Sequence, residues 1–349
     1  MLEPSVTILV LGYNNKSKLI ECLHSLEQTD YPNFRIILVD NASTDGSVEL
    51  VEANFPSIQI VKLNRNYGFV AYNLIVGKME DEYLALINND IVVDRDWLRH
   101  LMSYIANDEV AAVVPKLLLY SNRKRINAAG GMMDMFGVAW NRGNGEIDKG
   151  QYDRVEEVFY GVGAVFLLKK SVWLRIGGFD KRYFATADDV DWSWRARVAG
   201  YRVIYVPQAI AYHHWLSSIG LSDHLIYMAE SHQVANFIKN YQAATLVKLV
   251  PALLLIKLLK VIYLTLVRRE VKLALVTVRA IWWNLINLRG SIKKRKEINA
   301  LRRVSDKEIQ RMMFRGSLEL ALGLRKITHP AIDSLLKRKF KNFSEDSLR

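Results

Sequence analysis

The sequence predicts an α/β fold, with a mostly parallel sheet and helices on both of its faces, followed by an all-helical region. Up to about residue 222, short apolar runs rich in Val and Ile alternate with amphipathic segments. Beyond about Asp223 every apolar pattern has helical spacing. Alternation of the first kind is typical of parallel sheets whose crossovers are helices. We therefore expect two regions, an α/β domain over residues 1–222 and a helical region over residues 223–349.

The expected strands are short runs of apolar and β-branched residues. Arg35–Asp40 is such a run that ends in a carboxylate. Gly161 and Gly163 interrupt the buried strand expected over Val158–Leu168, and a glycine within a strand often marks the close approach of a ligand. The expected strands are Val6–Leu11, Arg35–Asp40, Ile58–Leu63, Tyr83–Ile87, Val110–Val114, Val158–Leu168, Tyr201–Val206 and Ala209–Tyr212.

The expected helices have apolar residues at helical spacing. Within Lys18–Gln28 that pattern includes Cys22, the single cysteine, which we interpret as an inert core residue. Residues 121–156 are rich in Gly, Asn and charged residues and predict a loop or hairpin instead. The expected helices are Lys18–Gln28, one from about Asp45, Phe69–Lys78, Trp97–Ile105, a short one after Leu168, one from the acidic cluster to Ala199, Thr245–Val267 and Val271–Leu288.

The positive charge is confined to the C-terminal third. Of the 48 Lys and Arg residues, 24 lie from Lys248 onward together with 8 of the 36 Asp and Glu residues, so this part has a net charge of +16 and the remainder −4. Segregated positive charge indicates an anionic partner, either nucleic acid or a membrane surface. A single cysteine and the lack of a basic, signal-like N-terminus indicate a reducing, cytosolic location.

The helical region predicts binding in the interface plane of an anionic membrane. The uncharged runs Leu249–Ile256 and Val261–Val267 are shorter than the roughly 18–20 residues that span a bilayer. Basic stripes, a Trp282-Trp283 pair and the polybasic segment 289–296 suit an interfacial helix. The alternative is an ordinary helical domain whose apolar faces pack on each other. RNA binding is not expected, because Lys293–Lys296 lacks interleaved aromatic residues.

Two acidic clusters, about a hundred residues apart, are the most informative motifs. In the first, an apolar run ends at Asp90; the second is Asp188-Asp189-Val190-Asp191. A carboxylate at a strand end can hold a divalent metal against a diphosphate. A second carboxylate can take a proton from an attacking hydroxyl. This pairing indicates group transfer from a nucleotide-activated donor.

The sequence shows no glycine-rich phosphate motif. No G-x-G-x-x-G follows the first strand, and a P-loop is absent. The donor phosphates are therefore expected to need a metal on Asp90, either Mg²⁺ or Mn²⁺. The turn after Asp40 is less specific, because Ser43 or Asp45 could simply cap the next helix.

The second cluster stands at a predicted helix start. Like charges raise the pKa of a carboxylate, whereas a helix N-terminus and Arg195 lower it. Asp191 and Arg195 are spaced i, i+4 and can pair on one helix face. The alternative is that these acids only cap and solvate the helix.

Taken in order, these segments resemble the family 2 glycosyltransferases, which have the Rossmann-like GT-A fold. The resemblance covers roughly residues 4–220 and is greatest to the rhamnosyltransferase-like branch that builds cell-surface polysaccharides. It rests on Ser5–Asn14, Val39–Ser47, Asn64–Asn73, Leu86–Asp90, Gly177–Asp180 with Phe184, Asp188–Asp191, Arg195 and His213.

The resemblance implies a role for each matching residue. Asp189 would be the catalytic base, with Asp188 in place of the usual Glu. Asp90 would hold the metal at the end of a thinned Asn88-Asn89-Asp90 motif, with His213 as a second metal ligand. Residues expected to bind or shape the nucleotide site are Tyr13, Asn14, Asp40, which would accept a hydrogen bond from the pyrimidine, Asn64, Asn66, Gly68, Asn73, Asn88, Asn89, Asp188, Asp191 and Arg195.

By the same resemblance we expect an inverting, metal-dependent transfer. The donor would be dTDP-rhamnose or, as the alternative, a UDP-sugar. The acceptor would be a glycan or a polyprenyl-diphosphate-linked glycan, with the enzyme peripheral on the inner face of the cell membrane. Two rivals are a nucleotidyltransferase, which offers no role for Asp188–Asp191, and a catalytically degenerate membrane-binding protein.

Overall fold

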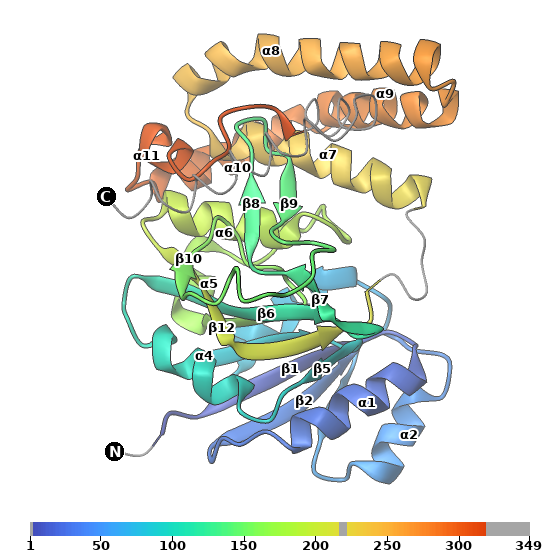
Figure 1. Cartoon of the computed structure of the whole chain (residues 1–349), viewed down its shortest axis with the longest axis vertical. Helices are drawn as coiled ribbons and strands as arrows, with labels where there is room; N and C mark the ends of the chain where they lie inside the picture. The colour runs from blue at the N-terminus through green and yellow to red at the C-terminus, as the bar shows by residue number, and fades with distance from the viewer. Residues whose placement is uncertain (1–2, 216–221, 319–349) are drawn as a thin grey trace.

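The computed structural model describes residues 3–215 and 222–318, which form an α/β domain with a helical region stacked on it (Figure 1). The main sheet has ten strands in the order β10-β12-β6-β11-β4-β1-β2-β3, with β5 beside β12 and β7 beside β6. The strands are β1 (Val6–Gly12), β2 (Phe34–Asp40), β3 (Gln59–Lys62), β4 (Tyr83–Asn88), β5 (Ile91–Val93), β6 (Val110–Leu119), β7 (Asn122–Ala128), β10 (Glu156–Glu157), β11 (Val165–Lys169) and β12 (Arg202–His213).

Only half of the sheet is parallel, so the expected mostly parallel sheet is a mixed one. β3, β2, β1 and β4 run parallel as predicted, because helical crossovers connect them. β11 is inserted antiparallel between β4 and β6. The register Gly12↔Asp40 and Leu11↔Asn88 brings the carboxyl ends of β1, β2 and β4 to one edge. This edge is where ligands bind in open α/β sheets.

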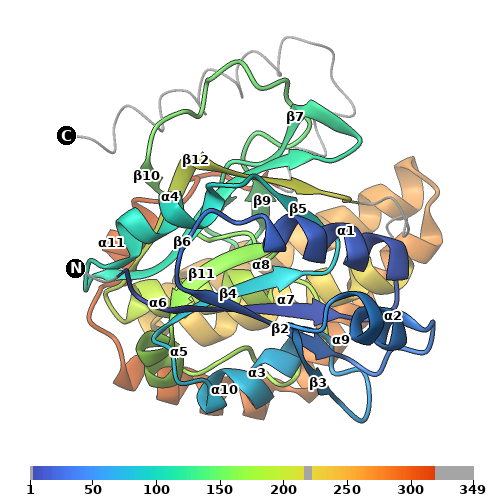
Figure 2. The same cartoon turned by 90° about the horizontal axis from the view of Figure 1, so that it is seen from below.

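Helices cover both faces of the sheet, and each face has its own apolar core. Leu19, Val51 and Trp97 represent the core under α1, α2 and α4. Tyr72 and Trp192 represent the core on the opposite face, under α3, α5 and α6. Figure 2 shows the two helical layers from below. The helices of the α/β domain are α1 (Lys16–Glu27), α2 (Ser47–Asn54), η1 (Gly68–Ala71), α3 (Tyr72–Ile75), η2 (Val76–Lys78), α4 (Trp97–Ile105), α5 (Lys170–Ile176) and α6 (Asp188–Val198).

The loop or hairpin expected over 121–156 is confirmed as a hairpin of β8 (Gly131–Met133) and β9 (Ala139–Asn141), accompanied by β7 and β10. Two segments differ from the predicted elements. The strand expected from Val158 begins only at Val165, because a turn at Gly163 and Ala164 precedes it. The two strands expected over 201–212 are one, β12, with an irregular register between Val206 and Ile210, where Pro207 cannot donate a ladder hydrogen bond.

The helical region shares a core with the α/β domain. Val190, Trp194 and Val198 of α6 pack with Phe237 and Leu253. Its elements are α7 (Asp223–Asn240), α8 (Ala243–Ile262), the π-helical η3 (Tyr263–Val267), α9 (Val271–Ile286), α10 (Leu288–Ala300) and α11 (Asp306–Gln310). The expected break between regions at 222/223 adjoins residues 216–221, which lie outside the described part.

The apolar helix expected over Thr245–Val267 is present, but the length of its uncharged runs understates how apolar it is. In the described residues, the continuous helix Ala243–Val267 is long and apolar enough to cross a membrane, with mean hydropathy 2.1, and Val271–Ile286 with Leu288–Ala300 would be a second span only as a pair bent by 66°. Counting uncharged runs misses this, because lysines can extend along a helix and keep the charged group at its surface. Length and composition alone do not distinguish a span from a helix lying on a surface.

Candidate active site

The loops after β1 and β2 are joined by the side chain of Asn14. Asn14 has a left-handed φ of 54°, and its backbone N–H donates to Ser43 Oγ at 2.9 Å while its Oδ1 accepts from Thr44 N at 2.9 Å. Asp40, only 4% exposed, accepts from Ser43 N at 3.2 Å. Tyr13 is exposed beside this loop. The structure therefore places these three predicted residues at one edge, and Tyr13 is the most exposed of them.

The segment Asn64–Gly68 closes the next part of this edge. Asn64 Oδ1 accepts from Tyr67 OH, and Asn66 Oδ1 accepts from Gly68 N, both at 2.8 Å. Gly68 has φ +59°, and a Cβ there would lie 1.8 Å from Phe184 O. A glycine is therefore required for residues 68 and 184 to approach each other. This contact joins the Asn64–Gly68 segment to the loop that precedes α6.

Asp90 and His213 lie together as the sequence predicts. His213 Nε2 is 3.5 Å from Asp90 Oδ1, and its Nδ1 is 2.9 Å from Asn127 Oδ1, which orients the ring. Burial acts to raise the pKa of Asp90, but the hydrogen bond and charge of His213 outweigh it and hold the pKa below the usual value. Within residues 3–215 and 222–318, no group of three or more His, Cys, Asp or Glu side chains is placed to hold a metal. The two-residue set fits Mg²⁺ or Mn²⁺ only when phosphate oxygens and water complete the coordination.

The neighbouring asparagines support this pair. Asn89 Nδ2 donates to the carbonyl of Asn14 at 3.0 Å and so links Asp90 to the first loop. Asn88 Oδ1 is buried and has no hydrogen-bond partner among the described residues. An unsatisfied buried acceptor at a candidate binding edge suits a donor group from a ligand.

Asp188 and Asp189 begin α6, as the sequence predicts. Asp189 Oδ2 accepts from Gly163 N at 2.8 Å, and Asp189 Oδ1 accepts from Val190 N at 2.8 Å. Burial raises the pKa of Asp189, and these hydrogen bonds only partly offset it. Burial and the adjacent charge of Asp189 raise the pKa of Asp188 well above its usual value. A raised pKa makes a carboxylate a stronger proton acceptor, which suits a general base.

Two adjacent residues hold the two acidic clusters to one loop. Asn88 N donates to Ala164 O at 3.1 Å, and Gly163 N donates to Asp189. A Cβ on Gly163 would lie 3.2 Å from Asp189 Cβ. The two clusters are about a hundred residues apart in sequence, yet both are hydrogen-bonded near the same two consecutive residues, Gly163 and Ala164.

Asp191, Arg195 and Asn73 have structural partners instead of an open face. Asp191 and Arg195 pair at 3.0 Å as predicted, but both side chains are buried, and Arg195 also donates to the carbonyls of residues 176–178. Asn73 exchanges two hydrogen bonds with the backbone of Phe179. Protein groups thus engage the polar atoms of Asp191 and Arg195, and their expected contact with the nucleotide stays a prediction.

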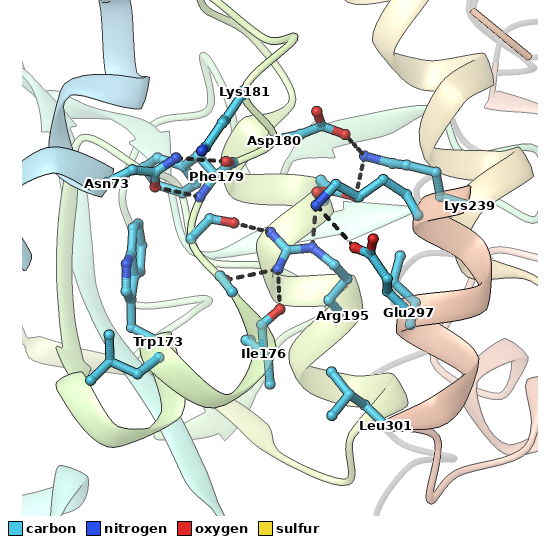
Figure 3. Close-up of a pocket in the computed structure, with 16 residues that line it drawn as sticks. Asn73, Trp173, Ile176, Phe179, Asp180, Lys181, Arg195, Lys239, Glu297 and Leu301 are labelled. Carbon is cyan, nitrogen blue, oxygen red and sulfur yellow. Dashed lines mark hydrogen bonds and ion pairs between the residues drawn. The ribbon is translucent and has the colours of Figure 1, made fainter. Parts of the chain in front are cut away.

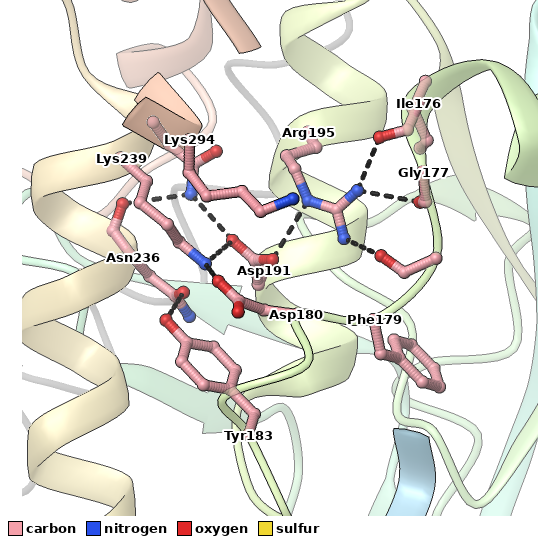
Figure 4. Close-up of polar contacts among 12 residues, drawn as sticks. Ile176, Gly177, Phe179, Asp180, Tyr183, Asp191, Arg195, Asn236, Lys239 and Lys294 are labelled. Carbon is pink, nitrogen blue, oxygen red and sulfur yellow. Dashed lines mark hydrogen bonds and ion pairs between the residues drawn. The ribbon is translucent and has the colours of Figure 1, made fainter. Parts of the chain in front are cut away.

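A cavity of about 330 Å³ lies beside these residues, between the 176–181 loop, α7 and α10 (Figure 3). Its inner wall contains Lys239 of α7, which the sequence did not single out. Lys239 Nζ lies 2.7 Å from Asp180 Oδ2 and 3.0 Å from Asp191 Oδ1 (Figure 4). No local pattern could have indicated it, because its partners are 59 and 48 residues away in the sequence.

Comparison with solved structures identifies the class of this fold. Over 69% of this chain and 49% of the other, it superimposes on the "Crystal structure of GalNAc-T7 with UDP, GalNAc and Mn2+" with a TM-score of 0.55 and 13% identity. At that identity the likeness concerns the fold alone. The fold is that of the GT-A glycosyltransferases, which confirms the fold predicted for the first region.

The sequence match bears on the family. Residues 7–173 match the model of "Glycosyl transferase family 2", which confirms the resemblance to that family seen in the sequence. It is 30% identical to "O-antigen biosynthesis protein RfbC" of Myxococcus xanthus over 60% of this chain, although the match spans only 17% of that relative. It is 24% identical to "N-acetylglucosaminyl-diphospho-decaprenol L-rhamnosyltransferase" of Mycobacterium tuberculosis (strain ATCC 25618 / H37Rv), over 65% of this chain and 81% of that protein. These relatives support the expected rhamnosyltransferase-like branch, and the chain spans only 17% and 25% of the first two curated relatives it matches.

Proposed function

We propose that this protein transfers a sugar from a nucleoside-diphosphate donor to a hydroxyl of a glycan or lipid-linked glycan, with inversion at the anomeric carbon. The observation that supports this best is the tether of Asn88 and Asp189 to adjacent residues, Ala164 and Gly163. This tether supports a site in which Asp90, two residues after Asn88, and Asp189 lie near one short loop. Metal chemistry at the diphosphate and proton removal at the acceptor can thus act on one donor.

In the proposed reaction Asp189 accepts the proton of the acceptor hydroxyl. The hydroxyl oxygen forms a bond to the anomeric carbon while the bond from that carbon to the diphosphate oxygen breaks. The nucleoside diphosphate leaves with the bond electrons, and no protein nucleophile takes part. Asp90 and His213 would hold Mg²⁺ or Mn²⁺, which stabilises negative charge on the leaving diphosphate. Mn²⁺ is present in the GalNAc-T7 complex with UDP.

For the donor we propose dTDP-rhamnose, with a UDP-sugar as the alternative. The support is the name of the mycobacterial relative, which acts on a decaprenol diphosphate carrier. A polyprenyl-diphosphate-linked acceptor follows from the same name. Thermal stabilisation by a panel of nucleotide sugars, each with and without Mn²⁺, tests the donor. A release assay for the nucleoside diphosphate, with and without a polyprenyl-diphosphate-linked acceptor, tests the transfer.

The outcomes of these assays separate the rival functions. Diphosphate release that rises with acceptor supports transfer, whereas incorporation of a nucleotide into product would support the nucleotidyltransferase. Nucleotide binding without turnover under every condition would support the degenerate, membrane-binding alternative. Asp189→Asn should retain nucleotide binding and lose turnover.

We also propose that α8 and α9 seat the enzyme on the cytoplasmic face of an anionic membrane. Large apolar side chains are exposed along both helices, among them Val247 of α8 at 76%, and Trp282 at 63% and Ile286 at 67% of α9. An exposed apolar surface of this kind marks an interaction site, and the positive charge of the region suits anionic lipid. The test is flotation of the full chain with phosphatidylglycerol vesicles. Trp282→Asp should reduce flotation, whereas Trp140→Asp, an exposed tryptophan of the α/β domain, should not.

A further inference from the structure

The two residues before the acidic cluster have a left-handed backbone conformation, which is unfavourable for residues other than glycine. Thr186 has φ 68° and Ala187 has φ 58°, both in the left-handed region. Neither is glycine, and consecutive left-handed residues of this kind persist only when their surroundings hold them. α6 starts directly after them with Asp188 and Asp189. This turn therefore sets the direction in which α6 begins, and with it the position of Asp189, the proposed base.

Helix α7 holds both carbonyls of the turn. His232 Nδ1 lies 2.9 Å from Thr186 O, and Asn236 Nδ2 donates to Ala187 O at 3.1 Å. A carbonyl only accepts, so His232 donates through Nδ1–H. Burial lowers the pKa of His232 to about 4, so the ring is neutral at pH 7 and this tautomer is fixed by the turn.

Tyr183 fixes the two α7 side chains in turn. Its ring stacks on His232 with centroids 3.9 Å apart, and its hydroxyl donates to Asn236 Oδ1 at 2.7 Å (Figure 4). Because Asn236 Oδ1 is engaged by Tyr183, its Nδ2 must face Ala187. The three side chains Tyr183, His232 and Asn236 therefore form one connected group that holds the turn.

His232 and its two neighbours on α7 contact the two helices with the exposed apolar surface. Gln233 Oε1 accepts from Lys257 of α8 at 2.9 Å, and the carbonyl of Ser231 accepts from Asn284 of α9 at 2.9 Å. The indole of Trp283 meets the edge of His232, with centroids 5.9 Å apart. Helix α7 thus contacts both the turn before the acidic cluster and the helices α8 and α9, which we propose to bind the membrane.

We propose that His232 and Asn236 are positioning residues for Asp189, holding the Thr186-Ala187 turn so that α6 presents this carboxylate to the acceptor. The inference rests on the proposed role of Asp189 as base. Neither residue touches the reacting atoms, and each acts through the backbone of the turn. The helical region therefore determines the geometry of proton removal in addition to membrane binding.

The test compares His232→Leu with His232→Asn in the full chain. Asparagine places an amide N–H near the position of Nδ1, whereas leucine has no donor. For His232→Leu we expect kcat to fall about 10- to 100-fold, the effect of a small displacement of a catalytic group, with KM for the nucleotide sugar and Kd for the free nucleotide unchanged. His232→Asn should restore most of kcat. His224→Leu, at an exposed position of the same helix, is the matched control and should behave as the wild type.

The outcomes are distinct. An unchanged kcat in His232→Leu overturns the inference. So does a parallel loss of kcat and nucleotide affinity that asparagine does not restore, because that pattern indicates general loss of structure. If His232→Leu does not fold, Asn236→Ala, which removes the donor to Ala187, is judged by the same separation of kcat from KM. Absence of sugar transfer by the wild type refutes the proposed function itself, before any variant is compared.

Discussion

Replacing Lys239 by methionine should destabilise the folded protein substantially. The side chains of Lys239, Asp180 and Asp191 are at most 3% exposed, and the two N···O distances are 2.7 and 3.0 Å. At an effective dielectric constant of about 20, each pair has a gross attraction of roughly 6 kcal/mol. That attraction offsets the several kcal/mol needed to remove each ion from water. Without the lysine, both carboxylates keep the desolvation cost and lose this compensation.

The remaining partners limit the expected loss. Asp180 keeps Arg182 at 2.8 Å, and Asp191 keeps Arg195 at 3.0 Å. Removing one partner of a buried ion pair costs about 3–5 kcal/mol. Because each carboxylate retains a guanidinium, we expect the lower end, about 3 kcal/mol. Methionine has a similar apolar stem, so a cavity adds little to this value.

Urea denaturation followed by tryptophan fluorescence at pH 7 measures the change. Lys62→Met is the control, since Lys62 and Glu52 form a pair of similar length, 2.8 Å, with both side chains more than half exposed. The control should unfold at the same urea concentration as the wild type. If Lys239→Met does so too, the buried network does not stabilise the fold and the reasoning is refuted.

The pH dependence gives a second check. Burial acts to raise the pKa values of Asp180 and Asp191, but Lys239 and the arginines outweigh it and hold both below the usual range. A depressed folded-state pKa gives stability that is present above the unfolded-state pKa, about 3.9, and is lost as the pH falls. The difference between wild type and Lys239→Met should therefore shrink below about pH 4.

Three further predictions concern the candidate site. Asp90→Ala should lower kcat about 10²- to 10³-fold and abolish Mn²⁺-dependent thermal stabilisation by nucleoside diphosphate. The control Asp96→Ala, on the exposed surface, should have neither effect. Equal stabilisation of Asp90→Ala and wild type would contradict a metal at Asp90. Because the pKa of Asp189 is raised from 3.8, kcat/KM should rise with pH through an ionisation above that value, and a profile flat down to pH 4 would contradict its role as base. Gly68→Ala should cost about 1–3 kcal/mol in stability and weaken nucleotide binding, because its φ is positive and its Cβ would meet Phe184 O; Gly77→Ala, whose Cβ would approach only Leu174 at 3.7 Å, should do neither.

Local sequence patterns predicted the parts of this protein that depend on local chemistry. The parallel strands from Val6 to Asn88 agree within two residues at each end, because each is an apolar run between turn residues. The pairing of Asp191 with Arg195 was predictable from i, i+4 spacing. The strand β11 was not predictable as antiparallel, since nothing in Val165–Lys169 states which neighbours it joins. Whether a strand runs parallel or antiparallel depends on the route of the chain between strands, and here that route includes β7 to β10.

The residues of the candidate site also fall into two groups, those that a local sequence pattern reveals and those that matter only through contacts between distant segments. Asp90, Asp188 and Asp189 stand out as carboxylates at the ends of apolar patterns. Asn127, which orients His213, is an ordinary residue of β7 and becomes relevant only because β7 folds back on β6. Lys239 appears in the sequence as one more basic residue near a basic region, yet it is buried against two carboxylates. Such residues depend on contacts between distant segments, which periodicity and spacing do not encode.

The position of α7 changes how the helical region should be understood. An appended membrane anchor would need only an exposed apolar face and a connection to the α/β domain. Instead α7 neutralises Asp180 and Asp191 through Lys239 and holds the carbonyls of Thr186 and Ala187. Asp189 is therefore constrained from two directions, by Gly163 from the sheet side and by α7 through the turn. The proposed base therefore depends on the helical region for its geometry, so deleting residues beyond 222 should abolish transfer even with an acceptor that needs no membrane.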